Sequence, residues 1–189
     1  MLTKQTKCYL DMDGLLANLF DFISNKIVNK NYIDATDSEK LKIKSVWTNK
    51  DLFYETLGSQ KDLFSNLEPY STNDTLIKKV VEKFGGFYIC SHPSKMSIDQ
   101  CIEGKLEWID KHIIPKYFQY FRGAIFPDKK STHALNNDGS KNLLIDDFQP
   151  YVDSWSEAGG IAIKLQSALY DNNSISLYID KEFEKNNLT

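Results

Sequence analysis

The sequence predicts an α/β fold in which a parallel sheet carries helices on both faces and a small helical cap is inserted after the first strand. Short, continuously apolar segments alternate with amphipathic helical segments, which is typical of strands buried between two layers of helices. A polar stretch rich in Lys and Asp interrupts this alternation after the first strand. Acidic or hydroxyl side chains follow three of the strands, at the edge where ligands bind to such sheets.

Each element follows from its local pattern. Apolar runs bounded by polar residues predict strands at residues 8–10, 87–90, 124–126, 143–145 and 161–163. Apolar residues at helical spacing predict helices at residues 15–28, 75–83, 97–112 and 149–158. Two of these helices end at the glycine pairs Gly85–Gly86 and Gly159–Gly160. Beyond the last strand, residues 171–189 are expected to combine a strand-like stretch with a polar helix end.

The interruption after the first strand defines the predicted domain organisation. It is polar and helix-like, with aromatic and leucine side chains scattered through it. We therefore expect residues 17–70 to form the helical cap, and residues 1–16 and 71–189 to form the sheet-containing core. A length of 189 residues suits one ordinary domain with a small insertion.

Composition excludes several classes of protein. The net charge of −3 and the pI near 5.6 disfavour a binder of nucleic acid polymers, which is usually basic. No apolar run approaches the ~20 residues of a membrane helix, and the polar N-terminus does not resemble a signal peptide. Three widely spaced cysteines do not make a disulfide framework, so a reducing, cytoplasmic setting is expected.

The candidate catalytic and metal-binding side chains stand at the ends of the predicted strands. Asp11 and Asp13 follow the first strand, Ser91 follows the second, and Asp146 and Asp147 end the fourth. Each motif alone has an ordinary explanation as turn or cap chemistry. Together they bring four carboxylates to one edge of the sheet, where mutual repulsion calls for a cation. Oxygen ligands without Cys or His suit Mg²⁺.

These motifs resemble those of the haloacid dehalogenase superfamily of phosphotransferases, which implies a Rossmann-like catalytic core. The segment Asp11-Met12-Asp13-Gly14-Leu15-Leu16 is similar to the first motif, Ser91 to the second, a lysine before the fourth strand to the third, and Asp146-Asp147 to the fourth. Within the superfamily, the sequence resembles the short phage and bacterial 5′(3′)-deoxyribonucleotidases. The resembling segments are Leu67-Glu68-Pro69, Ile89-Cys90-Ser91-His92-Pro93, Leu143 to Asp147, and Trp155 to Gly160.

The resemblance implies a role for each residue of the motifs. Asp11 would be the nucleophile that forms a phosphoaspartate, and Asp13 the general acid and base. The Asp11 side chain, the Asp13 backbone carbonyl and Asp146 would hold Mg²⁺, while Asp147 would orient the metal's water shell or the neighbouring lysine. Ser91 and the lysine would bind phosphate.

Three positions leave alternatives open. Lys130 matches the spacing of the relatives' lysine motif and is preferred, but Lys129 matches it in another alignment. His92 stands where relatives usually have Ser, and it would either donate a second hydrogen bond to the phosphate or line the entrance. Lys105 would lie near the site or be an ordinary helix charge.

The expected substrate is a (deoxy)nucleoside 5′-monophosphate, hydrolysed to nucleoside and phosphate, with the cap selecting the nucleoside. Cap residues expected to contact it are Leu19, Phe20, Trp47 and Phe64, although aromatic residues in a small helical unit also serve as its core. The alternatives are a phosphatase for another small phosphomonoester and a non-catalytic binding relative. We expect a monomer or homodimer, in the host cytoplasm if a phage encodes it.

Overall fold

The computed structural model describes residues 6–188, and the chain divides into two compact units. The first unit, called the sheet unit, contains the chain up to Leu16, Pro69–His92 and the chain from Tyr117 onward. The second, called the helical unit, contains Ala17–Glu68 and Pro93–Lys116. The sequence-based boundary grouped residues 93–116 with the sheet, whereas here they pack with the helices.

The sheet unit is built on five parallel strands in the order β3-β2-β1-β4-β5. The strands are β1 (Cys8–Leu10), β2 (Phe87–Cys90), β3 (Phe121–Ile125), β4 (Leu143–Asp146) and β5 (Ile161–Lys164). All five predicted strands are confirmed, although β3 begins three residues earlier than expected. Its early start follows from pairing of Phe121 with Phe87, after which the register shifts. The central strand β1 lies between β2 and β4, so its carboxyl end adjoins theirs.

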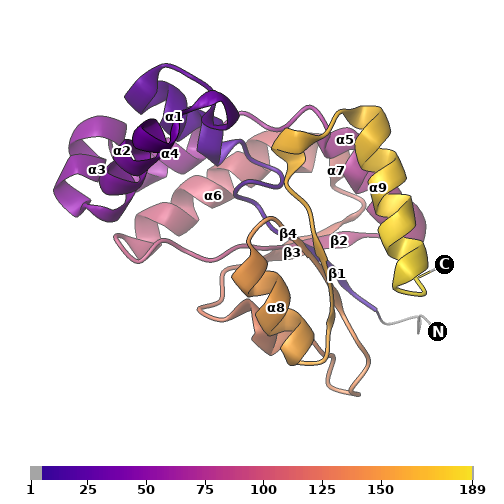
Figure 1. Cartoon of the computed structure of the whole chain (residues 1–189). Helices are drawn as coiled ribbons and strands as arrows, with labels where there is room; N and C mark the ends of the chain where they lie inside the picture. Colours follow the sequence, from indigo (N-terminus) through magenta and orange to yellow (C-terminus); the bar gives the residue numbers. More distant parts are fainter. Residues whose placement is uncertain (1–5, 189) are drawn as a thin grey trace. The chain divides into compact units, whose positions relative to one another are not determined.

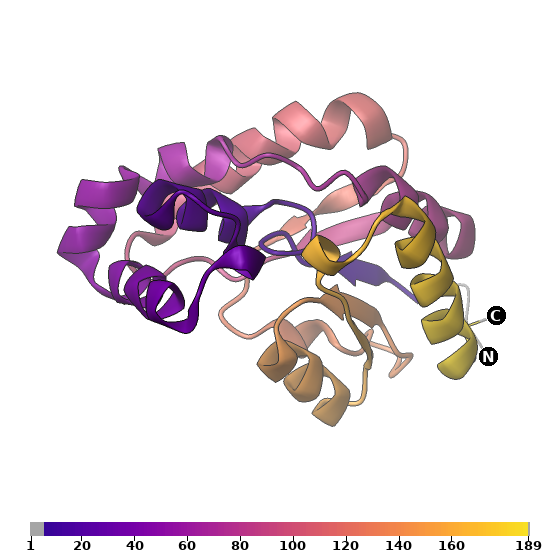
Figure 2. The ribbon, with the colours of Figure 1, turned by 45° about the horizontal axis from the view of Figure 1, so that its top comes forward.

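Helices cover both faces of this sheet (Figure 1, Figure 2). α8 packs on β4 and β5, while α5 and α9 pack together on the other side. The bounds are α5 (Asn73–Phe84), η2 (Lys130–His133), α8 (Gln149–Glu157), η3 (Ser167–Leu169) and α9 (Asn172–Lys185); a short α7 (Ile114–Tyr117) precedes β3. The expected strand-like stretch after residue 171 is wrong. Ile175, Ile179 and Phe183 recur every four residues and are buried along one face of α9.

The helical unit consists of α1 (Leu19–Val28), η1 (Tyr32–Asp34), α2 (Asp37–Thr48), α3 (Lys50–Leu57), α4 (Gln60–Ser65) and α6 (Ile98–His112). α1 begins four residues later than predicted, at an Asn18 cap whose side chain accepts from the Asp21 amide. α4 and α6 approach closely at Gly104, where a Cβ would lie 2.4 Å from the Lys61 carbonyl oxygen. Trp108 of α6 donates to the Leu67 carbonyl at 2.7 Å. These contacts explain why α6 groups with this unit. Within residues 6–188, no helix has the length and apolar composition needed to cross a membrane.

Candidate active site

The candidate site lies at the carboxyl ends of three adjacent strands. Asp11 directly follows β1, Ser91 follows β2, and Asp146 is the last residue of β4. Sheet pairing extends one step past the strands, because the Asp11 amide donates to Ile145 O at 2.9 Å and the Ser91 amide donates to Ile125 O at 3.1 Å. The backbone of Asp11 and Ser91 is therefore held by the sheet where the strands end.

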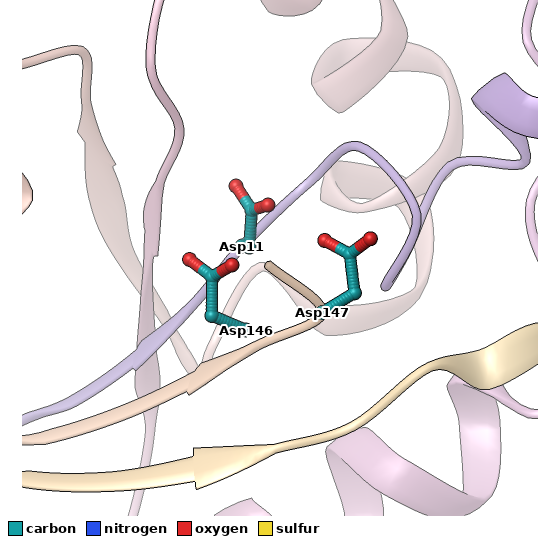
Figure 3. Close-up of side chains that lie close together, drawn as sticks. All are labelled: Asp11, Asp146 and Asp147. Carbon is teal, nitrogen blue, oxygen red and sulfur yellow. The ribbon is translucent and has the colours of Figure 1, made fainter. Parts of the chain in front are cut away.

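Three carboxyl groups converge at this edge. One oxygen from each of Asp11, Asp146 and Asp147 lies within 4.8 Å of the others, and all three residues are buried. Figure 3 shows the three carboxyl groups pointing to the same side of the chain segments that carry them, at the ends of β1 and β4. These are side-chain oxygens, so the expected Asp13 backbone carbonyl ligand stays a prediction. Asp147, expected to orient the metal's water shell or the lysine, has its carboxyl within reach of the same ion.

Lys130 supplies the positive charge of the site. Its ammonium Nζ lies 2.6 Å from Asp11 Oδ1 and 2.7 Å from Asp146 Oδ2, and the side chain is 1% exposed. The neighbouring Lys129 is exposed. Of the two lysines considered, the structure brings Lys130 to the carboxylates, because it opens η2 and turns inward there.

Burial and crowding shift the protonation of the site. Burial, with the Asp11 charge next in importance, raises the pKa of Asp146 to about 7. Burial, followed by the charges of Asp11, Asp146 and Asp13, raises the pKa of Asp147 to about 9. Burial disfavours the charged form of Lys130, but Asp11 and Asp146 outweigh burial and raise the pKa of Lys130 above the usual lysine value. The negative charge of the carboxyl cluster is therefore not fully neutralised by Lys130.

This donor set fits a hard divalent cation. All the converging ligand atoms are carboxylate oxygens, as Mg²⁺ prefers. If all three carboxyl groups are ionised, they and one ammonium leave two excess negative charges in a buried place, and a divalent cation would offset both. The elevated pKa values of Asp146 and Asp147 describe the cluster without that charge.

The remaining predicted residues lie around this cluster. Ser91 is fully buried at the end of β2. Asp13 is half-buried and close enough for its charge to raise the pKa of Asp147. His92 is half-buried, and its Nδ1 lies 3.2 Å from the Pro127 carbonyl oxygen. Since a carbonyl only accepts, that hydrogen bond requires the proton on Nδ1.

Sequence reasoning missed Tyr151. Its ring lies 4.6 Å from Lys130 Nζ, measured to the ring centroid, and 6.0 Å from the His92 ring. An aromatic residue in the first turn of a helix looks like ordinary core, so no motif signalled it. Its position four residues after Asp147, on the helix that follows the acidic pair, is the signal that could have found it.

The predicted cap residues all belong to the helical unit. Leu19 and Phe64 are buried, and Lys105 Nζ lies 4.7 Å from the Phe64 ring centroid. Trp47 is half-buried with its ring edge-on to Phe53 at 5.5 Å, and Phe20 is 38% exposed beside Tyr32. Phe20 and Trp47 therefore keep accessible ring surface, while Leu19 and Phe64 contribute to the interior.

Comparison with known proteins agrees with this fold and identifies a family. Residues 5–165 match the model of the family described as 5′ nucleotidase, deoxy (Pyrimidine), cytosolic type C protein. No curated protein matches the sequence.

Among solved structures, a hydrolase from Streptococcus pneumoniae TIGR4 is similar with a TM-score of 0.51 and 13% identity, over 94% of this chain and 100% of that one. A HAD-superfamily hydrolase, subfamily IA, variant 1, from Geobacter sulfurreducens PCA is similar with a TM-score of 0.50 and 14% identity, over 85% of this chain and 87% of that one. These likenesses establish the fold. The family match extends over most of the chain, and the protein therefore belongs to the 5′ nucleotidase, deoxy (Pyrimidine), cytosolic type C family, a group of phosphatases with the haloacid dehalogenase fold.

Proposed function

We propose that this phosphatase is a Mg²⁺-dependent nucleotidase that hydrolyses (deoxy)nucleoside 5′-monophosphates through a phosphoaspartate on Asp11. The observation that carries the proposal is the buried Asp11–Lys130–Asp146 ion-pair network, joined by Asp147, in a chain of the deoxy 5′ nucleotidase family. A nucleophilic carboxylate, a phosphate-binding cation and a metal-binding set are the parts that such a reaction needs.

In the first half of the reaction, an oxygen of the Asp11 carboxylate attacks the phosphorus of the substrate. The bond between phosphorus and the 5′ oxygen breaks, and Asp13 gives its proton to the departing oxygen, so a neutral nucleoside leaves. Asp13 is half-buried and lies close enough to Asp147 for its charge to act there, so its carboxyl belongs to the same acidic cluster as the nucleophile.

In the second half, Asp13 takes a proton from water as the water oxygen attacks the phosphorus of the phosphoaspartate. The bond between phosphorus and Asp11 breaks, which restores the carboxylate and releases inorganic phosphate. In both halves the Ser91 hydroxyl and the Lys130 ammonium donate hydrogen bonds to phosphate oxygens, and we propose His92 as a further contact. Lys130 is fixed for this role by its two carboxylate partners.

Asp11, Asp146 and the Asp13 carbonyl are proposed to hold Mg²⁺, with Asp147 close enough to bind it or to orient its waters. Bound Mg²⁺ would screen the repulsion between the Asp11 carboxylate and the phosphate dianion. The Asp147 carboxyl faces the same side as the other two, which supports its proposed place near the cation.

The helical unit, which contains most of the expected cap of residues 17–70, is proposed to select the nucleoside part of the substrate. Phe20 and Trp47 keep ring surface on which a nucleobase could stack, whereas Leu19 and Phe64 would shape the unit that presents them. A small substrate of this kind suits an acidic protein of −3 net charge better than a nucleic acid polymer does.

The test is phosphate release from a panel of 5′- and 3′-(deoxy)nucleoside monophosphates and sugar phosphates, with Mg²⁺ or with chelator, for the wild type and Asp11→Asn. We expect release from 5′-nucleotides above all, lost with chelator and lost in Asp11→Asn while its circular dichroism stays that of the wild type. Faster phosphate release from sugar phosphates than from nucleotides would overturn the proposed substrate class. Appreciable turnover by the Asp11→Asn variant would overturn the assignment of Asp11 as the nucleophile.

A further inference from the structure

Tyr151 is in direct contact with the lysine of the site, although no motif includes it. It lies in the first turn of α8, and its ring centroid is 4.6 Å from Lys130 Nζ. A cation within about 6 Å of a ring centroid and over its face is attracted by the ring's quadrupole. Lys130 is buried, so the attraction acts where water does not weaken it.

The Tyr151 ring is itself held in place. It packs against the core cluster that contains Trp155, one helical turn later on the same face of α8. The Phe148 ring meets it edge-on at 5.3 Å, and the His92 ring lies 6.0 Å away. A ring confined in this way can restrict the positions open to the flexible side chain beside it.

Lys130 depends on such a contact for a defined position, because its side chain ends in a point charge on a flexible four-carbon stem. Its ammonium forms ion pairs with two carboxylates, at 2.6 Å from Asp11 and 2.7 Å from Asp146, and donates a hydrogen bond to Asp146. The Asp11 partner changes during the proposed reaction, because its oxygen becomes bonded to phosphorus. The aromatic face of Tyr151 keeps the same charge distribution throughout.

We propose that Tyr151 is a positioning residue that holds the Lys130 ammonium at the phosphate through both halves of the reaction. The contact is made by the ring face, so the phenol hydroxyl is not required. Because the inference rests on the proposed role of Lys130 in phosphate binding, its test separates the contact from the reaction.

The kinetic arm compares Tyr151→Phe with Tyr151→Leu on whichever phosphomonoester the wild type hydrolyses fastest. Loss of the ring should lower kcat/KM roughly 2- to 30-fold, from the usual strength of cation–π contacts. Tyr151→Phe should stay within about twofold of wild type, since the ring face is retained. Tyr178→Leu is the matched control. Tyr178 is a half-buried tyrosine of α9 in the same unit, and its hydroxyl donates to the Lys164 carbonyl oxygen rather than contacting Lys130.

The second arm measures the contact without turnover. Urea unfolding in chelator is compared for the wild type, Tyr151→Leu, Lys130→Met and the double variant. Tyr151→Leu should lower the folding equilibrium constant by a factor roughly 2 to 30 times larger when Lys130 is present than when it is methionine.

The outcomes are distinct. Equal losses of kcat/KM in Tyr151→Phe and Tyr151→Leu would assign the role to the hydroxyl and overturn the proposal, as would no loss in Tyr151→Leu. Additive stability effects of the two substitutions would also overturn it. If nucleotides prove poor substrates but both arms behave as expected, the nucleotidase proposal fails while the positioning role stands.

Discussion

Lys130→Met tests whether the lysine is the cation that lets the carboxylate cluster fold without metal. The substitution keeps an unbranched side chain of similar length and removes one positive charge that lies 2.6 and 2.7 Å from two buried carboxylates. Removing one partner of a buried ion pair costs about 3–5 kcal/mol, because the remaining charge is left uncompensated. For a domain of this size each kcal/mol changes Tm by about 2–4 °C, so Lys130→Met should melt roughly 6–20 °C below the wild type.

The assay is thermal unfolding followed by circular dichroism in chelator, with Lys129→Met as the matched control. Lys129 is exposed one residue away, so its substitution should change stability by no more than about 0.5 kcal/mol. Added Mg²⁺ should then raise the Tm of Lys130→Met by more than it raises that of the wild type, because the cluster without its lysine carries one more uncompensated charge. Equal melting of the two variants in chelator would refute the reasoning.

Two further predictions concern stability. In chelator, the free energy of unfolding should fall as pH rises from about 4 to about 9. Folding raises the pKa of Asp146 to about 7 and that of Asp147 to about 9, so the folded protein binds more protons than the unfolded chain in this window. The measurement is urea unfolding across that pH range, and a free energy of unfolding that rises with pH would contradict the charge assignment. Gly104→Ala should destabilise the helical unit by about 1–3 kcal/mol, since the new Cβ would lie 2.4 Å from Lys61 O. A gain of about 1 kcal/mol in urea unfolding, as helix propensity alone predicts, would show that α4 and α6 can separate without cost.

The sheet and the acidic part of the site could be predicted because both depend on local sequence. Apolar runs marked all five strands, and the carboxyl ends of neighbouring parallel strands necessarily meet at one edge. Asp11 and Asp146 therefore had to lie close together once the strands were placed. Asp147 was predicted nearby, but its exact distance depended on how the chain leaves β4.

The rest depended on contacts between residues far apart in sequence. Residues 126–142 form a long connection without a repeating pattern, so spacing alone left Lys129 and Lys130 as alternatives until η2 fixed which one is buried. α6 packs with the helical unit because Gly104 admits α4, which periodicity within α6 does not reveal. Tyr151 has the pattern of a core residue, and only the position of Lys130 gives its ring a second role.

The arrangement around Lys130 also explains how one site can be stable both before and after substrate arrives. With the ammonium between Asp11 and Asp146, part of the carboxylate charge is offset by the chain itself, and the elevated pKa of Asp147 allows a proton to offset more. The remaining negative charge favours a divalent cation, whose binding would displace that proton. A phosphate dianion would then meet a site whose positive charges come from Lys130 and the cation. Under the proposed mechanism the lysine would serve folding first and phosphate binding second, and the Tyr151 ring, 4.6 Å from Nζ, would keep the same ammonium in place for both.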